Sequence, residues 1–253
     1  MIERNALLQV EELYKSYGEK KVVDGVGFVV ERGDIIGVLG PNGAGKTTTI
    51  RMITGVEGIS QGRIFFEGKE QTRNNRKMLQ QIGVVPQDIA VYSDMNAYDN
   101  VDFFCSLYGY GKKERRKRVQ EALEFVGLWD HRKERPDQFS GGMKRRLNIA
   151  CSITNDPELL IMDEPTVGID PQSRNHIMDT IRTLHQRGTA ILYVSHYMEE
   201  IEALCNRILL LDHGRVLADE GKEQFMNKYQ ETSEDSLEEI FLRLTGTALR
   251  DQE

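Results

Sequence analysis

One segment constrains the fold of this chain more than any other: a glycine-rich loop that directly follows an apolar run. The apolar run is Ile35-Ile36-Gly37-Val38-Leu39, and the loop reads Gly40-Pro41-Asn42-Gly43-Ala44-Gly45-Lys46-Thr47. A buried strand, a loop of this pattern and a following helix together form the phosphate-binding loop of nucleoside-triphosphate enzymes. The segment therefore predicts an α/β fold that presents a loop to a phosphate.

The residue types of the loop have a physical reason. Glycines at positions 40, 43 and 45 let the backbone curl so that successive amides point at phosphate oxygens. A helix expected from Thr47 adds its positive N-terminal end. We expect Lys46 to reach the β- and γ-phosphates and the Thr47 hydroxyl to ligate Mg²⁺. The predicted nucleotide contacts here are Gly40, Pro41, Asn42, Gly43, Ala44, Gly45, Lys46, Thr47 and Thr48.

A pair of acids follows a second apolar run. Leu159-Leu160-Ile161-Met162 leads directly into Asp163-Glu164, and ligands gather at the carboxyl ends of strands in open α/β sheets. Asp163 is expected to hold Mg²⁺ through water, because magnesium keeps much of its hydration shell. Strand side chains alternate in direction, so Glu164 is expected to point elsewhere and to orient and deprotonate the attacking water.

Guanine recognition is not predicted. It usually needs an N-K-x-D loop, whereas Asn227-Lys228 is followed by Tyr229-Gln230.

The order of patterns along the chain predicts a single domain over 1–253 with an inserted helical block. Strand patterns fill the first third, at 7–13, 22–30, 63–68 and 82–85, and from Asp88 to Asn155 the apolar periodicity is helical. Strands and helices then alternate, which favours a mostly parallel sheet covered on both faces. The predicted parts are a nucleotide-binding core with a β subdomain at 1–87 and 156–220, a helical subdomain at 88–155 and a helical tail at 221–253.

The tail contains a well-marked helix. Ser236 and Glu239 form a capping box, and Leu237, Ile240, Phe241 and Leu244 make an apolar stripe before Gly246. This helix must dock either on its own domain or on a partner.

Composition limits the partners. The formal net charge of −7 argues against nucleic acid, because phosphate backbones demand a basic surface. No apolar stretch approaches the roughly 18 residues of a membrane span, and no signal peptide is visible. Cys105, Cys151 and Cys205 lack C-x-x-C spacing, which predicts reduced, buried thiols rather than a metal site. The basic run 112–118 fits either a solvated helix face or a surface for anionic lipid headgroups or a membrane partner.

The segment Ser140-Gly141-Gly142-Met143-Lys144, ahead of the Asp163-Glu164 strand, resembles the signature of the ABC-transporter ATPases. The resemblance covers roughly residues 5 to 220. It implies a P-loop NTPase (RecA-like) core with an antiparallel β subdomain and an inserted α-helical subdomain. It also implies ATP and Mg²⁺ as ligands and ATP hydrolysis as the activity.

Further residues take roles from the same resemblance. Gln87 matches the Q-loop glutamine, a Mg²⁺ contact and hinge; His196 matches the switch histidine, and Tyr17 the aromatic that stacks on adenine. Residues 167–170 match the D-loop. The implied catalytic residues are Glu164, His196, Lys46 and Gln87. The implied metal contacts are Thr47, Gln87 and Asp163. The implied contacts to the nucleotide of a second copy are Ser140, Gly141, Gly142 and Asp170. Phe139 and Met143 depart from the usual leucine and glutamine, which puts a polar contact from position 143 to the ribose in doubt.

Two segments point to a branch of the family. Met143-Lys144-Arg145-Arg146-Leu147 and the ending 237–246 resemble bacterial exporter ATPases that handle drugs, antibiotics or polysaccharides. The resemblance implies a homodimer bound to an integral membrane permease at the cytoplasmic face of the cell membrane. The alternative is a soluble relative that drives a non-transport process such as cofactor assembly.

Overall fold

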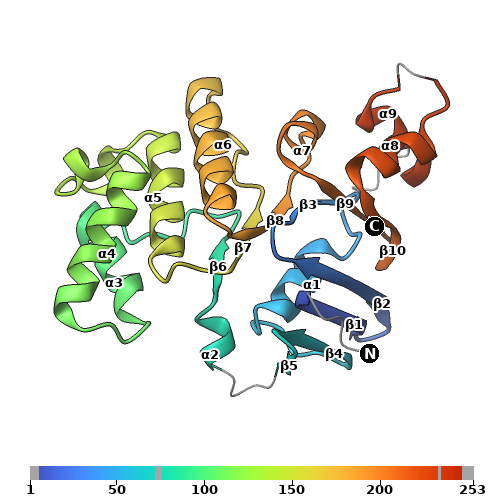
Figure 1. The fold of residues 1–253 in the computed structure, drawn as a ribbon, viewed down its shortest axis with the longest axis horizontal. Helices are drawn as coiled ribbons and strands as arrows, with labels where there is room; N and C mark the ends of the chain where they lie inside the picture. The colour runs from blue at the N-terminus through green and yellow to red at the C-terminus, as the bar shows by residue number, and fades with distance from the viewer. Residues whose placement is uncertain (1–5, 72–75, 233–234, 247–253) are drawn as a thin grey trace. The chain divides into compact units, whose positions relative to one another are not determined.

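The computed structural model describes residues 6–71, 76–232 and 235–246 and divides the chain into two compact units. Unit 1 comprises Met1–Met78 and Ala190–Glu253, and unit 2 comprises Leu79–Thr189 (Figure 1). The short helix α2 (Arg76–Leu79) spans the boundary in the sequence. The predicted helical subdomain, 88–155, lies within unit 2, which also holds two strands and a further helix. The finer domain boundaries stay a prediction.

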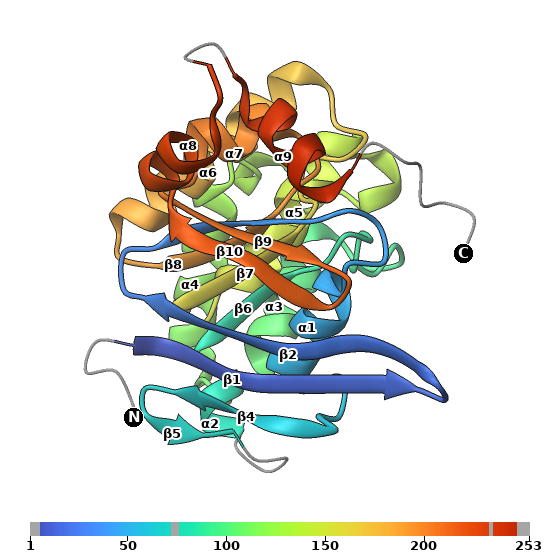
Figure 2. The ribbon, with the colours of Figure 1, turned by 90° about the vertical axis from the view of Figure 1, so that its right-hand side faces the viewer.

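Unit 1 contains an antiparallel sheet. Its strands are β1 (Ala6–Tyr17), β2 (Lys20–Glu31), β4 (Gln61–Phe66) and β5 (Lys69–Glu70), in the order β2-β1-β4-β5 (Figure 2). The strands expected at 7–13, 22–30 and 63–68 therefore form, and they build the antiparallel β subdomain. The strand expected at 82–85 also forms, but it belongs to unit 2.

The second group of strands in unit 1 is mostly parallel. It comprises β3 (Ile35–Leu39), β8 (Ala190–Val194), β9 (Arg207–Asp212) and β10 (Arg215–Gly221), in the order β10-β9-β3-β8. β3 runs parallel to both β8 and β9. Every residue of β3 and β8 is buried, as expected for parallel strands covered on both faces.

The last helix of the tail packs against other helices of unit 1. α9 (Leu237–Thr245) contacts α7 (Met198–Leu204) and α8 (Lys222–Tyr229). Leu237 and Ile240 are fully buried, and the Leu237 amide donates to Glu202 Oε1 at 3.1 Å. The capping box at Ser236 forms as predicted. The helix therefore docks on its own unit.

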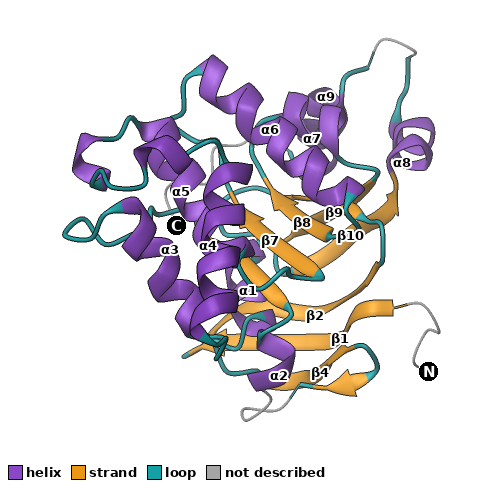
Figure 3. Ribbon diagram, turned by 60° about the vertical axis from the view of Figure 1, so that its left-hand side comes forward, coloured by secondary structure: helices purple, strands orange, loops and turns teal. Residues whose placement is uncertain are grey.

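Unit 2 combines a parallel strand pair with helices (Figure 3). β6 (Ile82–Val85) pairs with β7 (Leu159–Asp163). The helices are α3 (Ala97–Ser106), α4 (Lys112–Phe125), α5 (Gly141–Ile153) and α6 (Pro171–Gln186), with the 3-10 turns η1 (Trp129–His131) and η2 (Pro136–Gln138). α3, α4 and α5 contact one another.

The helical phase begins later than the sequence pattern indicates. Residues 88–96 form a loop, and α3 begins only at Ala97, with Asn96 as its N-cap. Asn100 organises this loop: its buried amide donates to the carbonyls of Tyr92, Met95 and Asn96 and accepts from the Tyr92 amide. The helical prediction for 88–96 is therefore wrong, and over residues 92–96 the Asn100 side chain, rather than a helix, satisfies backbone groups.

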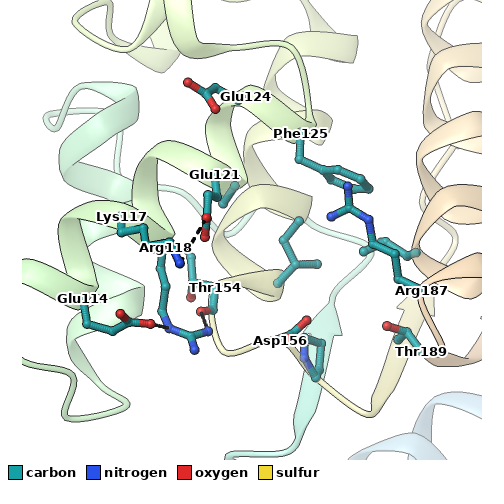
Figure 4. A pocket seen from close by; sticks show the side chains of 14 residues that line it. Glu114, Lys117, Arg118, Glu121, Glu124, Phe125, Thr154, Asp156, Arg187 and Thr189 are labelled. Atoms are coloured by element: carbon teal, nitrogen blue, oxygen red, sulfur yellow. Dashed lines mark hydrogen bonds and ion pairs between the residues drawn. The ribbon is translucent and has the colours of Figure 1, made fainter.

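The basic run lies on α4, beside a groove of about 750 Å³ in unit 2 (Figure 4). Within the groove Arg118 donates to Glu114 at 2.7 Å and to the Thr154 carbonyl at 3.1 Å, and Lys117 pairs with Glu121 at 3.6 Å. Lys112, Lys113 and Arg116 are exposed. Carboxylates thus offset part of the run, and both interpretations of the remaining cations stay open.

The three cysteines are free and buried, as predicted. Burial raises the pKa of the Cys105, Cys151 and Cys205 thiols, which suits inert core residues. Within the described ranges, no helix combines the length and apolar composition that crossing a bilayer requires.

Candidate nucleotide site

The glycine loop in unit 1 is shaped by close backbone contacts. Gly45 has a φ of +96°, and a Cβ there would lie 2.7 Å from the Val22 carbonyl oxygen. A Cβ at Gly40 would lie 2.3 Å from the carbonyl oxygen of Leu211. Side chains cannot be accommodated at such distances, so these two positions require glycine for both conformation and space.

Lys46 is the first residue of α1 (Lys46–Ile53), one residue earlier than predicted. It is only 8% exposed, and its ammonium group donates to the carbonyls of Gly40 at 2.6 Å and Pro41 at 3.1 Å. The first amides of a helix have no intrahelical acceptor, and the N-cap here is Gly45, which brings no competing side chain. A curled loop, a buried cation and a helix N-terminus without a side-chain cap together fit a triphosphate.

Three segments of unit 1 meet at one sheet edge. Val38 of β3 is in register with Val194 of β8, and Leu39 with Leu210 of β9. Because these strands are parallel, the glycine loop, the turn that carries His196 and the end of β9 emerge on the same side. The structure therefore brings the predicted His196 and the loop to a common edge.

A buried hydrogen-bond network supports the turn that carries His196. Tyr193 Oη and Ser195 Oγ donate to Glu200 Oε2 at 2.7 and 2.9 Å, and the Tyr197 amide donates to Ser195 Oγ at 3.0 Å. Glu200 is 1% exposed, whereas His196 is exposed. Sequence reasoning missed Glu200. The available signal was an acid in the first turn of the short helix α7, three residues after the N-cap Tyr197.

Tyr17, the predicted adenine contact, lies at the end of β1 and is 47% exposed. The Lys15 ammonium lies 5.2 Å from the centre of its ring. The ring is accessible for stacking, and its contact with adenine stays a prediction.

The second set of predicted residues lies at the ends of the paired strands in unit 2. Val85 of β6 is in register with Met162 of β7, so Gln87 and Glu164 follow the two strands on the same side. Gln87 Nε2 donates to Glu164 Oε2 at 3.0 Å. The structure thus joins two of the predicted catalytic residues directly.

The backbone at Glu164 differs from the expected geometry. β7 ends at Asp163, and Glu164 has a φ of +47° in the left-handed region. The expectation that strand alternation directs Glu164 is therefore wrong. A left-handed turn directs its side chain instead, a conformation that non-glycine residues adopt at a cost and often at functional sites.

The signature segment and the D-loop aspartate meet at two helix starts in unit 2. Ser140 is the N-cap of α5, and its hydroxyl accepts from the Met143 amide at 3.2 Å. Asp170 is the N-cap of α6, and the Ser173 amide hydrogen bond lowers the pKa of its carboxyl group. A Cβ at Gly142 would lie 2.2 Å from Ser173 Oγ, so glycine is required where the helices touch.

Comparisons with known proteins agree with this geometry. The family model described as ABC transporter matches residues 23–167, more than half of the chain. The chain belongs to the ABC transporter family of ATP-binding proteins. It is 49% identical over 84% of its length to the linearmycin resistance ATP-binding protein LnrL of Bacillus subtilis (strain 168), covering 68% of that protein. It is 43% identical over 85% of its length to the Nod factor export ATP-binding protein I of Paraburkholderia xenovorans (strain LB400), covering 70% of that protein.

A solved structure supports the same assignment. An ATP-binding subunit of an ABC transporter superposes with a TM-score of 0.84 at 28% identity, over 94% of this chain and 99% of that one. The resemblance, the P-loop fold and the ATPase activity predicted from the sequence are therefore confirmed, and the chain is an ATP-binding transporter subunit with export-type relatives.

The residues of this ABC ATPase that are expected at the metal have suitable chemistry. Thr47 offers a hydroxyl, Gln87 an amide oxygen and Asp163 a carboxylate, and Mg²⁺ prefers such hard oxygen ligands. Thr47 belongs to unit 1, and the other two belong to unit 2. Their convergence on one ion stays a prediction.

Sequence reasoning also missed Arg145 of α5. It is 4% exposed, and its guanidinium donates to the carbonyls of Pro86 and Gln87. The available signal was its position: residue 145 is three after Gly142 and three before Asn148, on the buried face of the ABC signature helix.

Proposed function

We propose that this ABC ATPase works as a pair of identical chains that closes on two ATP molecules and powers export through a separate membrane permease. The observation that carries the proposal is the hydrogen bond from Gln87 to Glu164 at the ends of two adjacent strands. This hydrogen bond holds the buried carboxylate of Glu164 after the end of β7, where it could take a proton from water. The relatives named for linearmycin resistance and Nod factor export support the export role.

The proposed reaction uses each residue for one task. Lys46 and the loop amides bind the β- and γ-phosphates, while Tyr17 stacks on adenine. Thr47, Gln87 and Asp163 would hold Mg²⁺, which neutralises phosphate charge when bound. Glu164 takes a proton from water as that water attacks the γ-phosphorus. The bond between γ-phosphorus and bridging oxygen breaks, ADP leaves, and His196 donates a hydrogen bond to the transferred group.

The second copy would complete each site. Ser140-Gly141-Gly142 presents a hydroxyl and helix amides but is uncharged. Such a helix end can contact an anion that a cation already holds, and it binds an anion weakly alone. We therefore place Ser140, Gly141, Gly142 and Asp170 of one chain at the nucleotide held by its partner.

The proposed location follows from the permease partner. The ATPase would lie on the cytoplasmic face of the cell membrane, attached to the permease. Nucleic acid is not a proposed partner, since the net charge is −7.

The decisive experiment replaces Glu164 with glutamine. Turnover should fall by roughly two orders of magnitude or more, since the general base is lost. The variant should accumulate as an ATP-bound dimer in size-exclusion chromatography. Glu158→Gln is the matched control, because Glu158 immediately precedes β7 whereas Glu164 immediately follows it. Unchanged turnover in Glu164→Gln would refute the base assignment.

Detergent extraction of membranes tests the export assignment. The ATPase should co-purify with an integral membrane protein. Recovery entirely in the soluble extract would instead favour a process such as cofactor assembly.

A further inference from the structure

Arg145 links the signature helix to the Q-loop inside unit 2. Its Nη1 donates to the Pro86 carbonyl at 2.7 Å, and its Nη2 donates to the Gln87 carbonyl at 2.6 Å. The side chain is 4% exposed. A planar guanidinium can bond two successive carbonyls at once in a fixed geometry, whereas a lysine ammonium acts as a point charge.

The link continues to the proposed base. The Gln87 backbone held by Arg145 carries the side chain that donates to Glu164 Oε2 at 3.0 Å. Arg145 lies five residues after Ser140, the N-cap of the same helix. One continuous path therefore runs from the signature serine through α5, the guanidinium and the Gln87 peptide to the Glu164 carboxylate.

Ser152 makes a second contact from α5, which reaches strand β6 rather than the Q-loop. Ser152 Oγ donates to the Val84 carbonyl at 2.7 Å, inside β6 and before the Q-loop. It attaches the helix to the strand without touching Gln87. Of these two contacts, Arg145 is the one that reaches the Q-loop glutamine.

We infer that Arg145 is a positioning residue for hydrolysis, holding the Gln87 backbone so that the Gln87 amide restrains Glu164. The inference rests on the proposed function, since it requires Glu164 to act on water. In the dimer, Arg145 then acts on the ATP that its own chain's loop binds, whereas Ser140 of the same helix contacts the partner's ATP.

The first test compares Arg145→Met, Arg145→Lys and the control Ser152→Ala. Arg145→Met should lower kcat about tenfold or more, as expected when a reacting group is misplaced. Its ATP affinity by calorimetry should stay within about twofold, since the Lys46 loop is unchanged. Arg145→Lys should recover part of kcat, and Ser152→Ala should lower only the melting temperature. A kcat of Arg145→Met within about twofold of wild type would overturn the inference.

The second test uses mixed dimers with one intact site. One chain carries Ser140→Arg and its partner carries Lys46→Ala, so the first chain's loop, Gln87 and Glu164 work with the second chain's Ser140. Arg145→Met should lower turnover when placed in the first chain and leave it unchanged in the second. Loss in the second placement, alone or equal to that in the first, would overturn the inference, because it would show that the substitution damages the α5 start that serves the partner's ATP.

The two tests separate the inference from the proposed function. A mixed dimer with turnover no higher than the single variants would count against shared sites, and the first test would still decide the role of Arg145. If Arg145→Met does not fold, Arg145→Lys takes its place in the mixed dimer.

Discussion

Helices α1 and α5 both begin where we propose that phosphate binds, but the two starts are built differently. α1 follows Gly45, a residue without a side chain, and it carries the buried Lys46 within a glycine loop. α5 follows Ser140, whose hydroxyl already accepts from the Met143 amide. The α1 start has its own cation and no side-chain cap, whereas the Ser140 side chain caps the α5 start and brings no charge.

This difference indicates an order of binding. A helix end with a buried cation can hold ATP in a single chain, because charge-assisted hydrogen bonds are the strong ones. A capped, uncharged helix end contributes less to ATP affinity than an end with a buried cation. ATP should therefore bind first at α1 of one chain, and the α5 start of the other chain should join only on closure.

Among substitutions at the starts of α1, α5 and α9, Lys46→Ala should weaken ATP binding most. Lys46 is the buried cation that we propose to contact the β- and γ-phosphates, so its loss should weaken ATP binding by about two orders of magnitude. Calorimetry on the isolated protein measures this directly. Lys69→Ala, on the short strand β5, is the control. Normal affinity in Lys46→Ala would count against the loop as the primary phosphate site.

Gly142→Ala should have an intermediate effect, on closure rather than on first binding. Its methyl group would meet Ser173 at 2.2 Å, which should cost about 1–3 kcal/mol and displace the start of α5. ATP affinity should stay normal while turnover falls about tenfold.

Ser173→Gly provides the matched background for Gly142→Ala. It removes the side chain that the new methyl group would meet, so adding Gly142→Ala there should cost much less in melting temperature and turnover. An equal loss in both backgrounds would show that the contact with Ser173 is not the cause.

Ser236→Ala should have the smallest effect on ATP binding and turnover, because Ser236 caps α9, where no ligand is proposed. Loss of this N-cap should destabilise α9 by about 1 kcal/mol. Hydrogen exchange of the α9 amides should rise, and turnover should not change. Ser236→Thr keeps a capping hydroxyl and should restore protection. A loss of turnover would mean that the tail also acts in hydrolysis.

Local patterns were predicted well from the sequence. The capping box at Ser236 and the strand before the glycine loop both form as expected. Each depends on residues within a few positions of one another, so spacing alone specifies it. The prediction of a helix over 88–96 is wrong, and the Asn100 side chain bonds the backbone of Tyr92, Met95 and Asn96 there.

The arrangement at Glu164 could be predicted only in part. The sequence indicates an acid after a buried strand and, through the family resemblance, a glutamine at position 87. The left-handed backbone of Glu164 and its hydrogen bond from Gln87 depend on the pairing of β6 with β7, which are far apart in the chain. The contacts of Arg145 and Glu200 could not be predicted, because packing brings their partners to them.

Short segments of the sequence specify the chemical groups of this protein: a phosphate-binding loop, a carboxylate pair and a signature serine. Backbone conformation in each segment follows residue type. The side chains that hold those groups in place, the direction of Glu164 and the docking of α9 depend instead on the folded chain. Such contacts join residues separated by tens of positions, and strand register and helix packing bring them together.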